Sequence, residues 1–247
     1  GRSRTNIGLP GLQMELLQEI QKVNKNIVLV VMSGRPLDLS WEDQNIPAIV
    51  QAWHLGSKSG DAIAQVLYGD YNPSGKLTMS FPRNVGQVPV YYNFKNTGRP
   101  STSIEQVTNS GYADVENSPL YPFGYGLSYT EFKYSDFEIS SSTMTKDSKI
   151  NVSIRVTNTG KYKGEEVVQL YLRDIVGSIA RPMKELKGFE KIELNPGESK
   201  IVNFEIENSL LEFYSYNNVW ESESGKFHVF IGTDSNVIDH KEFYLTD

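Results

Sequence analysis

A series of short alternating apolar runs in the second half of the chain constrains the fold most strongly. From residue 132 onward, apolar and polar residues alternate as they do in half-buried strands, and turn signals such as Asn158-Thr159-Gly160 and Asn195-Pro196-Gly197 separate the runs. The runs lie at residues 132–139, 150–156, 167–172, 186–194, 201–206, 213–214 and 227–231. About seven short strands with regular turns are typical of an immunoglobulin-like β-sandwich. We therefore expect an all-β sandwich domain over residues 131–247.

The first part of the chain follows a different pattern. Leucines at helical spacing predict a helix over residues 11–24, and residues 57–68 predict another. The apolar runs 27–32 and 48–53 predict two strands, both of the kind that is buried on both faces. Helix alternating with strand favours a parallel α/β sheet, but two strands are fewer than the roughly five or six of an ordinary sheet. Residues 1–82 are therefore expected to form part of an α/β domain.

Residues 83–130 show no clear periodicity and are expected to form a connector between these two domains. Its last stretch, residues 119–130, is rich in large apolar side chains, unlike a flexible linker. We expect this stretch to be well packed, with Phe123 and Leu127 largely buried.

Composition excludes several classes of function. The net charge of −6 disfavours binding to nucleic acid or to an anionic membrane. The absence of cysteine excludes disulfides, thiolate catalysis and zinc-thiolate sites. His54, His228 and His240 are scattered along the sequence without metal-ligand spacing, so neither a metal site nor a cofactor is expected.

Two motifs stand out beyond the general pattern. Residues 69–82 read G-D-Y-N-P-S-G-K-L-T-M-S-F-P: Gly69 ends a helix, Asn72-Pro73 and Ser74-Gly75 form a turn, and residues 77–81 alternate like a strand. Residues 119–130 read P-L-Y-P-F-G-Y-G-L-S-Y-T.

Together with Ser33-Gly34-Arg35-Pro36-Leu37 and the runs at 181–189 and 226–232, these motifs resemble the C-terminal portion of family 3 glycoside hydrolases. The subgroup that the chain is most similar to is the bacterial periplasmic β-glucosidases. Thr78 stands where that family usually has proline.

The resemblance implies a fold and an activity. The fold would be the end of an α/β (three-layer) sandwich domain followed by a fibronectin type III-like domain. The activity of the parent enzyme would be hydrolysis of terminal non-reducing β-D-glucosyl residues by retaining double displacement. In the family, a barrel domain carries the nucleophilic aspartate, and the acid/base glutamate is expected just ahead of Gly1. The chain would then hold no catalytic residue and would be inactive alone. The resemblance makes Ser3 and Arg4 the candidate substrate-binding residues.

The acidic residues of the chain have simpler interpretations. Asp38, Glu42 and Asp43 follow the Gly34-Arg35-Pro36 turn and are expected to cap a short helix rather than to act in catalysis. His54 follows a predicted parallel strand, at an edge where α/β proteins bind ligands, but packing is the favoured role.

The implied partners are carbohydrates: β-glucosides or oligosaccharides. Because the predicted sheet is incomplete, association with a second copy or with a missing N-terminal part is also expected. The resemblance implies a periplasmic or secreted location. A non-catalytic carbohydrate-binding or interaction module is the alternative, which the sandwich and the 14 tyrosines permit.

Overall fold

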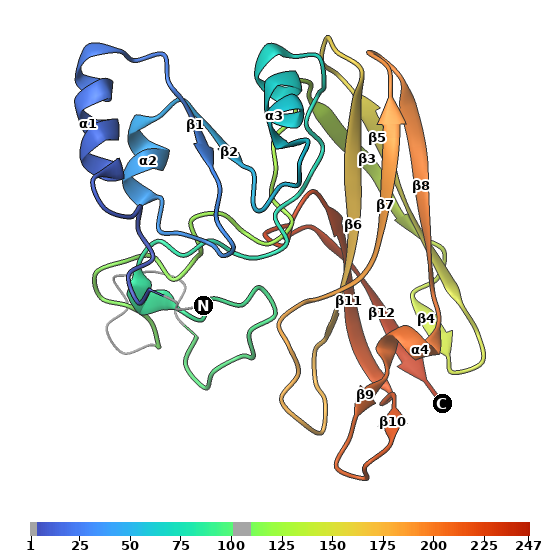
Figure 1. Ribbon diagram of the computed structural model, residues 1–247. Helices are drawn as coiled ribbons and strands as arrows, with labels where there is room; N and C mark the ends of the chain where they lie inside the picture. The colour runs from blue at the N-terminus through green and yellow to red at the C-terminus, as the bar shows by residue number, and fades with distance from the viewer. Residues whose placement is uncertain (1–3, 101–109) are drawn as a thin grey trace. The chain divides into compact units, whose positions relative to one another are not determined.

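The computed structural model describes residues 4–100 and 110–247, which divide into two compact units (Figure 1). Unit 1 holds residues 4–71, 79–91 and the described part of 99–122. Unit 2 holds residues 72–78, 92–98 and 123–247. The units therefore alternate along the chain, and segments of the 83–130 region belong to each. The division of the sequence at residues 82 and 130 stays a prediction.

Unit 1 is built around a small parallel sheet. Its helices are α1 (Gln13–Val23), α2 (Ser40–Asn45), α3 (Ser59–Tyr68) and the 3-10 turn η1 (Val85–Gln87), and its strands are β1 (Val28–Val31) and β2 (Ala48–Gln51). β1 and β2 pair in parallel from Val28↔Ala48 to Val31↔Gln51. The expected partial α/β domain is confirmed.

The strands predicted within residues 27–32 and 48–53 are present, but their predicted burial on both faces is wrong, and so is the strand predicted at residues 77–81. Within the runs 27–32 and 48–53 only Val31 and Ala52 are buried, and Met32 is 56% exposed. Residues 77–81 form no strand: Phe81 makes one isolated bridge, to Tyr121.

Unit 2 is a β-sandwich of two main sheets. Its elements are β3 (Phe132–Ile139), β4 (Thr143–Thr145), β5 (Ile150–Asn158), β6 (Gly164–Asp174), β7 (Glu185–Leu194), β8 (Ser199–Ile206), α4 (Asn208–Leu211), β9 (Phe213–Tyr214), β10 (Trp220–Glu221), β11 (Gly225–Gly232) and β12 (His240–Thr246). One sheet has the order β4-β12-β11-β6-β7 and the other β3-β5-β8, while β9 and β10 form a small hairpin. The sandwich expected from the alternating pattern is confirmed.

The core of unit 2 follows the period of two in its strands. Ile150, Val152, Ile154 and Val156 of β5 alternate with less buried residues and meet apolar side chains of the five-stranded sheet, such as Val229. The intervening residues of β11, including His228 and Phe230, therefore lie on the other face of that sheet.

Residues 72–78 are tied to the rest of unit 2 by hydrogen bonds. Asn72 Nδ2 donates to the Lys163 carbonyl (3.0 Å), and Asn72 Oδ1 accepts from the Tyr129 amide (2.8 Å). Lys76 Nζ lies 3.1 Å from a Glu166 carboxylate oxygen. The Asn-Pro-Ser-Gly turn thus serves as a strap on the sandwich, although its sequence continues the helix of unit 1.

The segment 123–130 is packed less completely than its sequence predicts. Phe123 is partly buried and stacks on Tyr92, with ring centroids 4.3 Å apart. Leu127, however, is 73% exposed, so the prediction that it is buried is wrong.

In the part of the chain that the structure describes, no helix is long and apolar enough to span a lipid bilayer.

Candidate functional site

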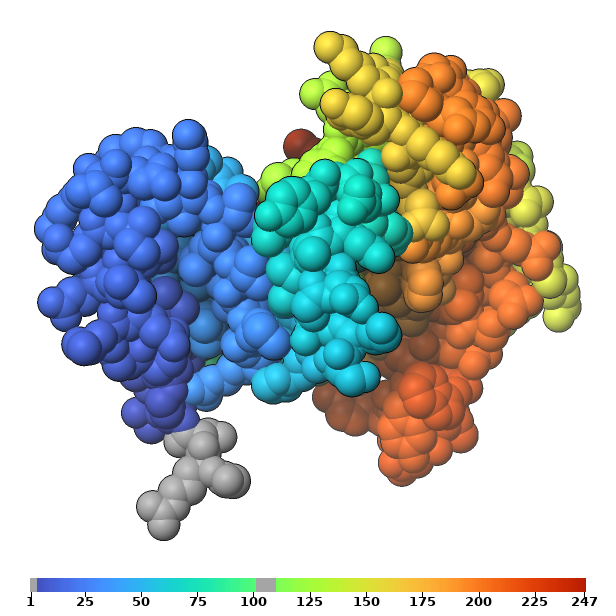
Figure 2. Space-filling model, turned by 45° about the horizontal axis from the view of Figure 1, so that its top comes forward, coloured from blue at the N-terminus to red at the C-terminus, as the bar shows by residue number. Residues whose placement is uncertain are grey.

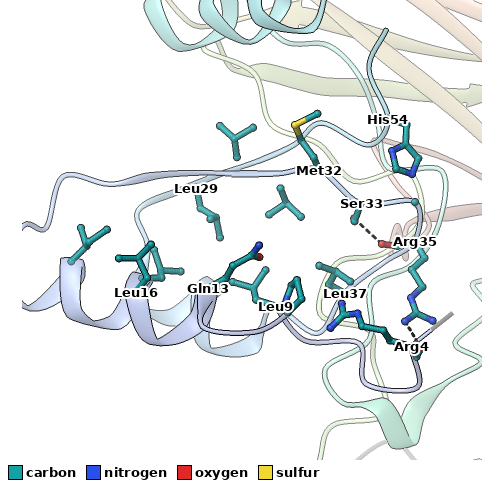
Figure 3. A pocket seen from close by; sticks show the side chains of 16 residues that line it. Arg4, Leu9, Gln13, Leu16, Leu29, Met32, Ser33, Arg35, Leu37 and His54 are labelled. Carbon is teal, nitrogen blue, oxygen red and sulfur yellow. Dashed lines mark hydrogen bonds between the residues drawn. The ribbon is translucent and has the colours of Figure 1, made fainter. Parts of the chain in front are cut away.

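The candidate site is an open cavity of about 830 Å³ on unit 1, which runs along α1 and β1 and reaches the edge where β1 and β2 end (Figure 3). Ligands of open α/β sheets bind at this edge. The cavity is lined by Arg4, Leu9, Pro10, Gln13, Leu16, Leu17, Ile20, Leu29, Val30, Val31, Met32, Ser33, Gly34, Arg35, Leu37 and His54. It has a polar end, formed by Arg4, Ser33, Arg35 and His54, and an apolar wall contributed by α1 and β1 (Figure 3).

Two arginines dominate the polar end. The Arg35 guanidinium donates to the carbonyls of Arg4 (2.5 Å) and Asn6 (3.3 Å), so it holds the segment before α1. The Arg4 guanidinium donates to the Gly8 carbonyl (3.2 Å). Within the described residues neither guanidinium has a carboxylate partner, so both keep donors for an oxygen-rich ligand.

The turn that follows β1 packs against the residue that follows β2. Trp53 has a φ of 51°, a left-handed conformation that is uncommon for a non-glycine residue. The next residue, His54, lies over Gly34: a Cβ at position 34 would come within 2.8 Å of His54 Nε2. A side chain at position 34 would therefore displace the His54 ring.

The apolar wall is open to solvent. Leu16 of α1 is 61% exposed, and Ile20 and Met32 are also exposed. In the space-filling view, the blue N-terminal part of the chain that contains α1 lies open at the surface (Figure 2). Exposed apolar patches of this kind mark surfaces that another polypeptide or ligand covers.

No aspartate or glutamate is among the described residues that line the cavity. The acids near it have local partners: Asp38 Oδ1 accepts from the Ser40 amide (3.1 Å), and Asp43 Oδ1 accepts from the Tyr121 hydroxyl (2.7 Å). Glu42 is buried in α2, and desolvation raises the pKa of its carboxyl above the usual range. The cavity therefore offers hydrogen-bond donors and apolar surface, but no acid and base of its own.

Of the two predicted substrate-binding residues, Arg4 lies at the polar end of the cavity, and Ser3 lies outside the described residues. Reasoning from the sequence assigned no site role to Ser33 or Arg35, which the structure brings to the same end. The available signal was their position directly after a predicted parallel strand, the same signal that singled out His54.

A second surface with exposed rings lies on unit 2. The β9–β10 hairpin carries Tyr214, Tyr216 and Trp220, and Trp220 is 68% exposed. The rings of Tyr214 and Trp220 lie edge to face, with centroids 6.0 Å apart. No local sequence pattern indicates this cluster, because the hairpin register, which sets Trp220 opposite Tyr214, brings the rings together.

The chain matches known families over both units. Residues 1–129 match the glycosyl hydrolase family 3 C-terminal domain, and residues 166–235 match a fibronectin type III-like domain. A periplasmic β-glucosidase of Salmonella typhimurium is 52% identical over 244 residues, and a β-xylosidase of Formosa agariphila is 41% identical over 250 residues.

The matched relatives are longer than this chain. The match to the Salmonella protein covers 98% of this chain and 32% of that protein, and the match to the Formosa protein covers 100% and 33%. A crystal structure of β-glucosidase from Listeria innocua in complex with glucose superposes with a TM-score of 0.91 at 39% identity, covering 98% of this chain and 34% of that one. The chain thus spans about a third of the length of these relatives. Because the family model matches more than half of the chain, this protein belongs to glycosyl hydrolase family 3 and carries its C-terminal domain.

Proposed function

We propose that this chain is the C-terminal part of a periplasmic or secreted β-glucosidase, which removes terminal β-D-glucosyl residues with retention of configuration. The family match over residues 1–129 carries the proposal. The 52% identity to a periplasmic β-glucosidase favours glucosides over xylosides and favours export.

The proposal divides the chemistry between this chain and the rest of the enzyme. Retaining hydrolysis needs a carboxylate nucleophile and a carboxylic acid about 5–5.5 Å apart. The cavity has no such pair among its described lining residues, so we propose that both groups come from the polypeptide preceding Gly1. The 247-residue chain by itself would then not hydrolyse glycosides.

In this proposal Arg4 contributes binding rather than proton transfer. Among the described residues its guanidinium donates to the Gly8 carbonyl and has further donors left, and it lies beside Arg35 at the polar end (Figure 3). These donors would bind a sugar hydroxyl or orient a neighbouring carboxylate. Ser3 would lie in the same segment.

The test compares the 247-residue chain with the complete polypeptide that its gene encodes, using an aryl β-D-glucoside and an aryl β-D-xyloside. We expect turnover of the glucoside only by the complete polypeptide. In that polypeptide Arg4→Ala should lower kcat/KM by about 10- to 100-fold, the range for losing a charge-assisted hydrogen bond, whereas Lys25→Ala at an exposed position should change nothing. Full activity of the isolated chain, or equal effects of the two variants, would refute the proposal.

We propose further that the apolar wall of α1 and β1 is covered by the two thirds of the enzyme that this chain does not span. The isolated chain should then bind a hydrophobic dye at this wall and bind the separately produced N-terminal portion. Leu16→Glu should abolish both. If light scattering instead shows a stable dimer that Leu16→Glu dissociates, a second copy covers the wall and this part of the proposal is wrong.

The ring cluster on the β9–β10 hairpin supports a second candidate, a carbohydrate-binding module. Exposed aromatic rings offer apolar faces on which sugar rings can stack. Retardation of the isolated chain in a gel containing soluble β-glucan would support it, provided that Trp220→Ala removes the retardation and Tyr162→Ala, at an exposed position away from the hairpin, does not. Unretarded migration of the isolated chain would exclude it.

A further inference from the structure

The pairing of β11 with β12 brings three metal-ligating side chains together on unit 2. His228 lies directly opposite Glu242, and Phe230 lies opposite His240. Directly opposite residues point to the same face, as do residues two apart on one strand. His228, His240 and Glu242 therefore share the outer face of the five-stranded sheet, on the side away from Phe227 and Val229 in the core.

The side chains are close enough to hold one ion. His228 Nε2 lies 3.0 Å from Glu242 Oε1, and the two imidazole rings are stacked with centroids 4.0 Å apart. One ligand atom from each of the three residues falls within 4.8 Å of the others. Ligands about 2.0–2.1 Å from a tetrahedral zinc ion lie roughly 3.3 Å apart. The stacked rings would have to turn so that one nitrogen of each points at the ion.

The surroundings prepare these groups for a metal. His240 Nδ1 lies 3.1 Å from the Ile238 carbonyl. When Nδ1–H donates to that oxygen, Nε2 keeps its lone pair, which is the usual outer support of a histidine ligand.

Two cations lie near the cluster and set a limit on affinity. Arg173 of β6 stands opposite His228, and Lys226 Nζ donates to Glu242 Oε2 (3.1 Å). The lysine occupies one carboxylate oxygen and leaves Oε1 directed at His228. A metal at the cluster would therefore be bound by Oε1, in competition with Lys226 for the charge of the carboxylate.

We propose that His228, His240 and Glu242 form a Zn²⁺ site. Two imidazoles and one carboxylate are a donor set that suits zinc, with water as the fourth ligand. The ion would clip the C-terminal strand β12 to β11 and so stabilise unit 2. This proposal is independent of the proposed function, because it concerns no residue of the cavity on unit 1.

The test titrates ZnCl2 into chelator-treated protein without an affinity tag, followed by calorimetry. We expect one saturable site per chain and a higher melting temperature with zinc. Co²⁺ should give the visible absorption bands of a four-coordinate ion. His228→Ala and His240→Ala should each weaken binding by at least about tenfold, as even loss of an outer-shell partner does.

The chain supplies its own control, since it has three histidines. His54→Ala should leave zinc affinity unchanged, and Lys226→Met should strengthen it by freeing the carboxylate. His240 is exposed, so its variant should keep the fold, which the melting temperature of the metal-free protein checks. Absence of a saturable site would overturn the proposal. So would zinc binding that survives in the His228→Ala and His240→Ala variants, or that His54→Ala removes.

Discussion

Replacing Lys76 by methionine should destabilise unit 2 far more than an exposed lysine replacement does. Lys76 Nζ donates to the Gly126 carbonyl (3.0 Å) and forms an ion pair with Glu166 (3.1 Å), and the two side chains are only 11% and 4% exposed. Glu166 Oε1 also accepts from the Tyr134 hydroxyl (3.1 Å). Without Lys76, the buried carboxylate keeps only that neutral donor among these contacts.

The expected loss is large because the remaining charge is buried. Breaking one side of a buried ion pair costs about 3–5 kcal/mol. For a protein of this size that corresponds to a fall in melting temperature of roughly 6–20 °C. The double variant Lys76→Met/Glu166→Gln removes the charge as well and should recover most of the loss. Lys149→Met, which removes an ion pair with Glu205 at the surface, should change the melting temperature little.

The loss should also depend on pH. Desolvation raises the pKa of Glu166, and Lys76 opposes that rise. Because the folded protein holds this proton more tightly than the unfolded chain, the group stabilises the fold below its unfolded pKa, and that stability is lost as pH rises through the folded pKa. Removing Lys76 raises the folded pKa further. The Lys76→Met variant should therefore differ most from the parent at pH 7–8 and approach it near pH 5.

Denaturant unfolding at several pH values measures these differences. Comparable losses for Lys76→Met and Lys149→Met would show that the Lys76 pair behaves as a surface pair. A loss that does not change with pH, or that the double variant does not recover, would refute the account of a stranded carboxylate.

Three further predictions each rest on the surroundings of one residue. Burial lowers the pKa of Lys184 to about 8, so NMR of the lysine side chains should show Lys184 titrating near pH 8. Its contribution to the free energy of unfolding should grow between pH 8 and the usual lysine pKa, because the unfolded chain binds more protons there than the folded protein. Titration of Lys184 together with the exposed lysines would contradict this. Glu42→Gln should stabilise the protein at pH 7, since Glu42 Oε1 is buried without a hydrogen-bond partner in the described structure. The gain in unfolding free energy should shrink on acidification, because the carboxyl of the parent protein, whose pKa is raised by burial, then takes up a proton. A destabilised variant would contradict this. Gly126→Ala should lower the melting temperature more than Gly60→Ala does. A Cβ at position 126 would lie 2.6 Å from the Gly75 carbonyl oxygen, whereas position 60 faces open space. Equal melting temperatures of the two variants would show that residues 72–78 move aside without cost.

The sequence by itself determined the local structure and the family. The alternation in residues 132–231 predicted the sandwich because period-two burial is a property of each strand alone. The helical spacing of residues 11–24 predicted α1 for the same reason, although that helix begins at Gln13. The motifs at 69–82 and 119–130 were enough to indicate the family.

Exposure was harder to predict, because it depends on what covers a side chain rather than on its own pattern. The apolar run 27–32 resembles a strand buried on both faces, yet Met32 is exposed where the described chain supplies no second neighbour for β1. The predicted burial of Leu127 is wrong for a similar reason, because the apolar character of a side chain does not specify what packs against it, and this side chain faces solvent.

Only the tertiary structure decided which distant residues share a site. Arg35 and His54 meet because two parallel strands end at one edge, and Arg35 holds Arg4 there through its carbonyl. Lys76 meets Glu166 because the strap lies on the sandwich. His228 and His240 looked scattered, and the β11–β12 register stacks their rings. Strand register and chain crossing are long-range choices made by the whole core, so no local pattern around these residues encodes their meeting.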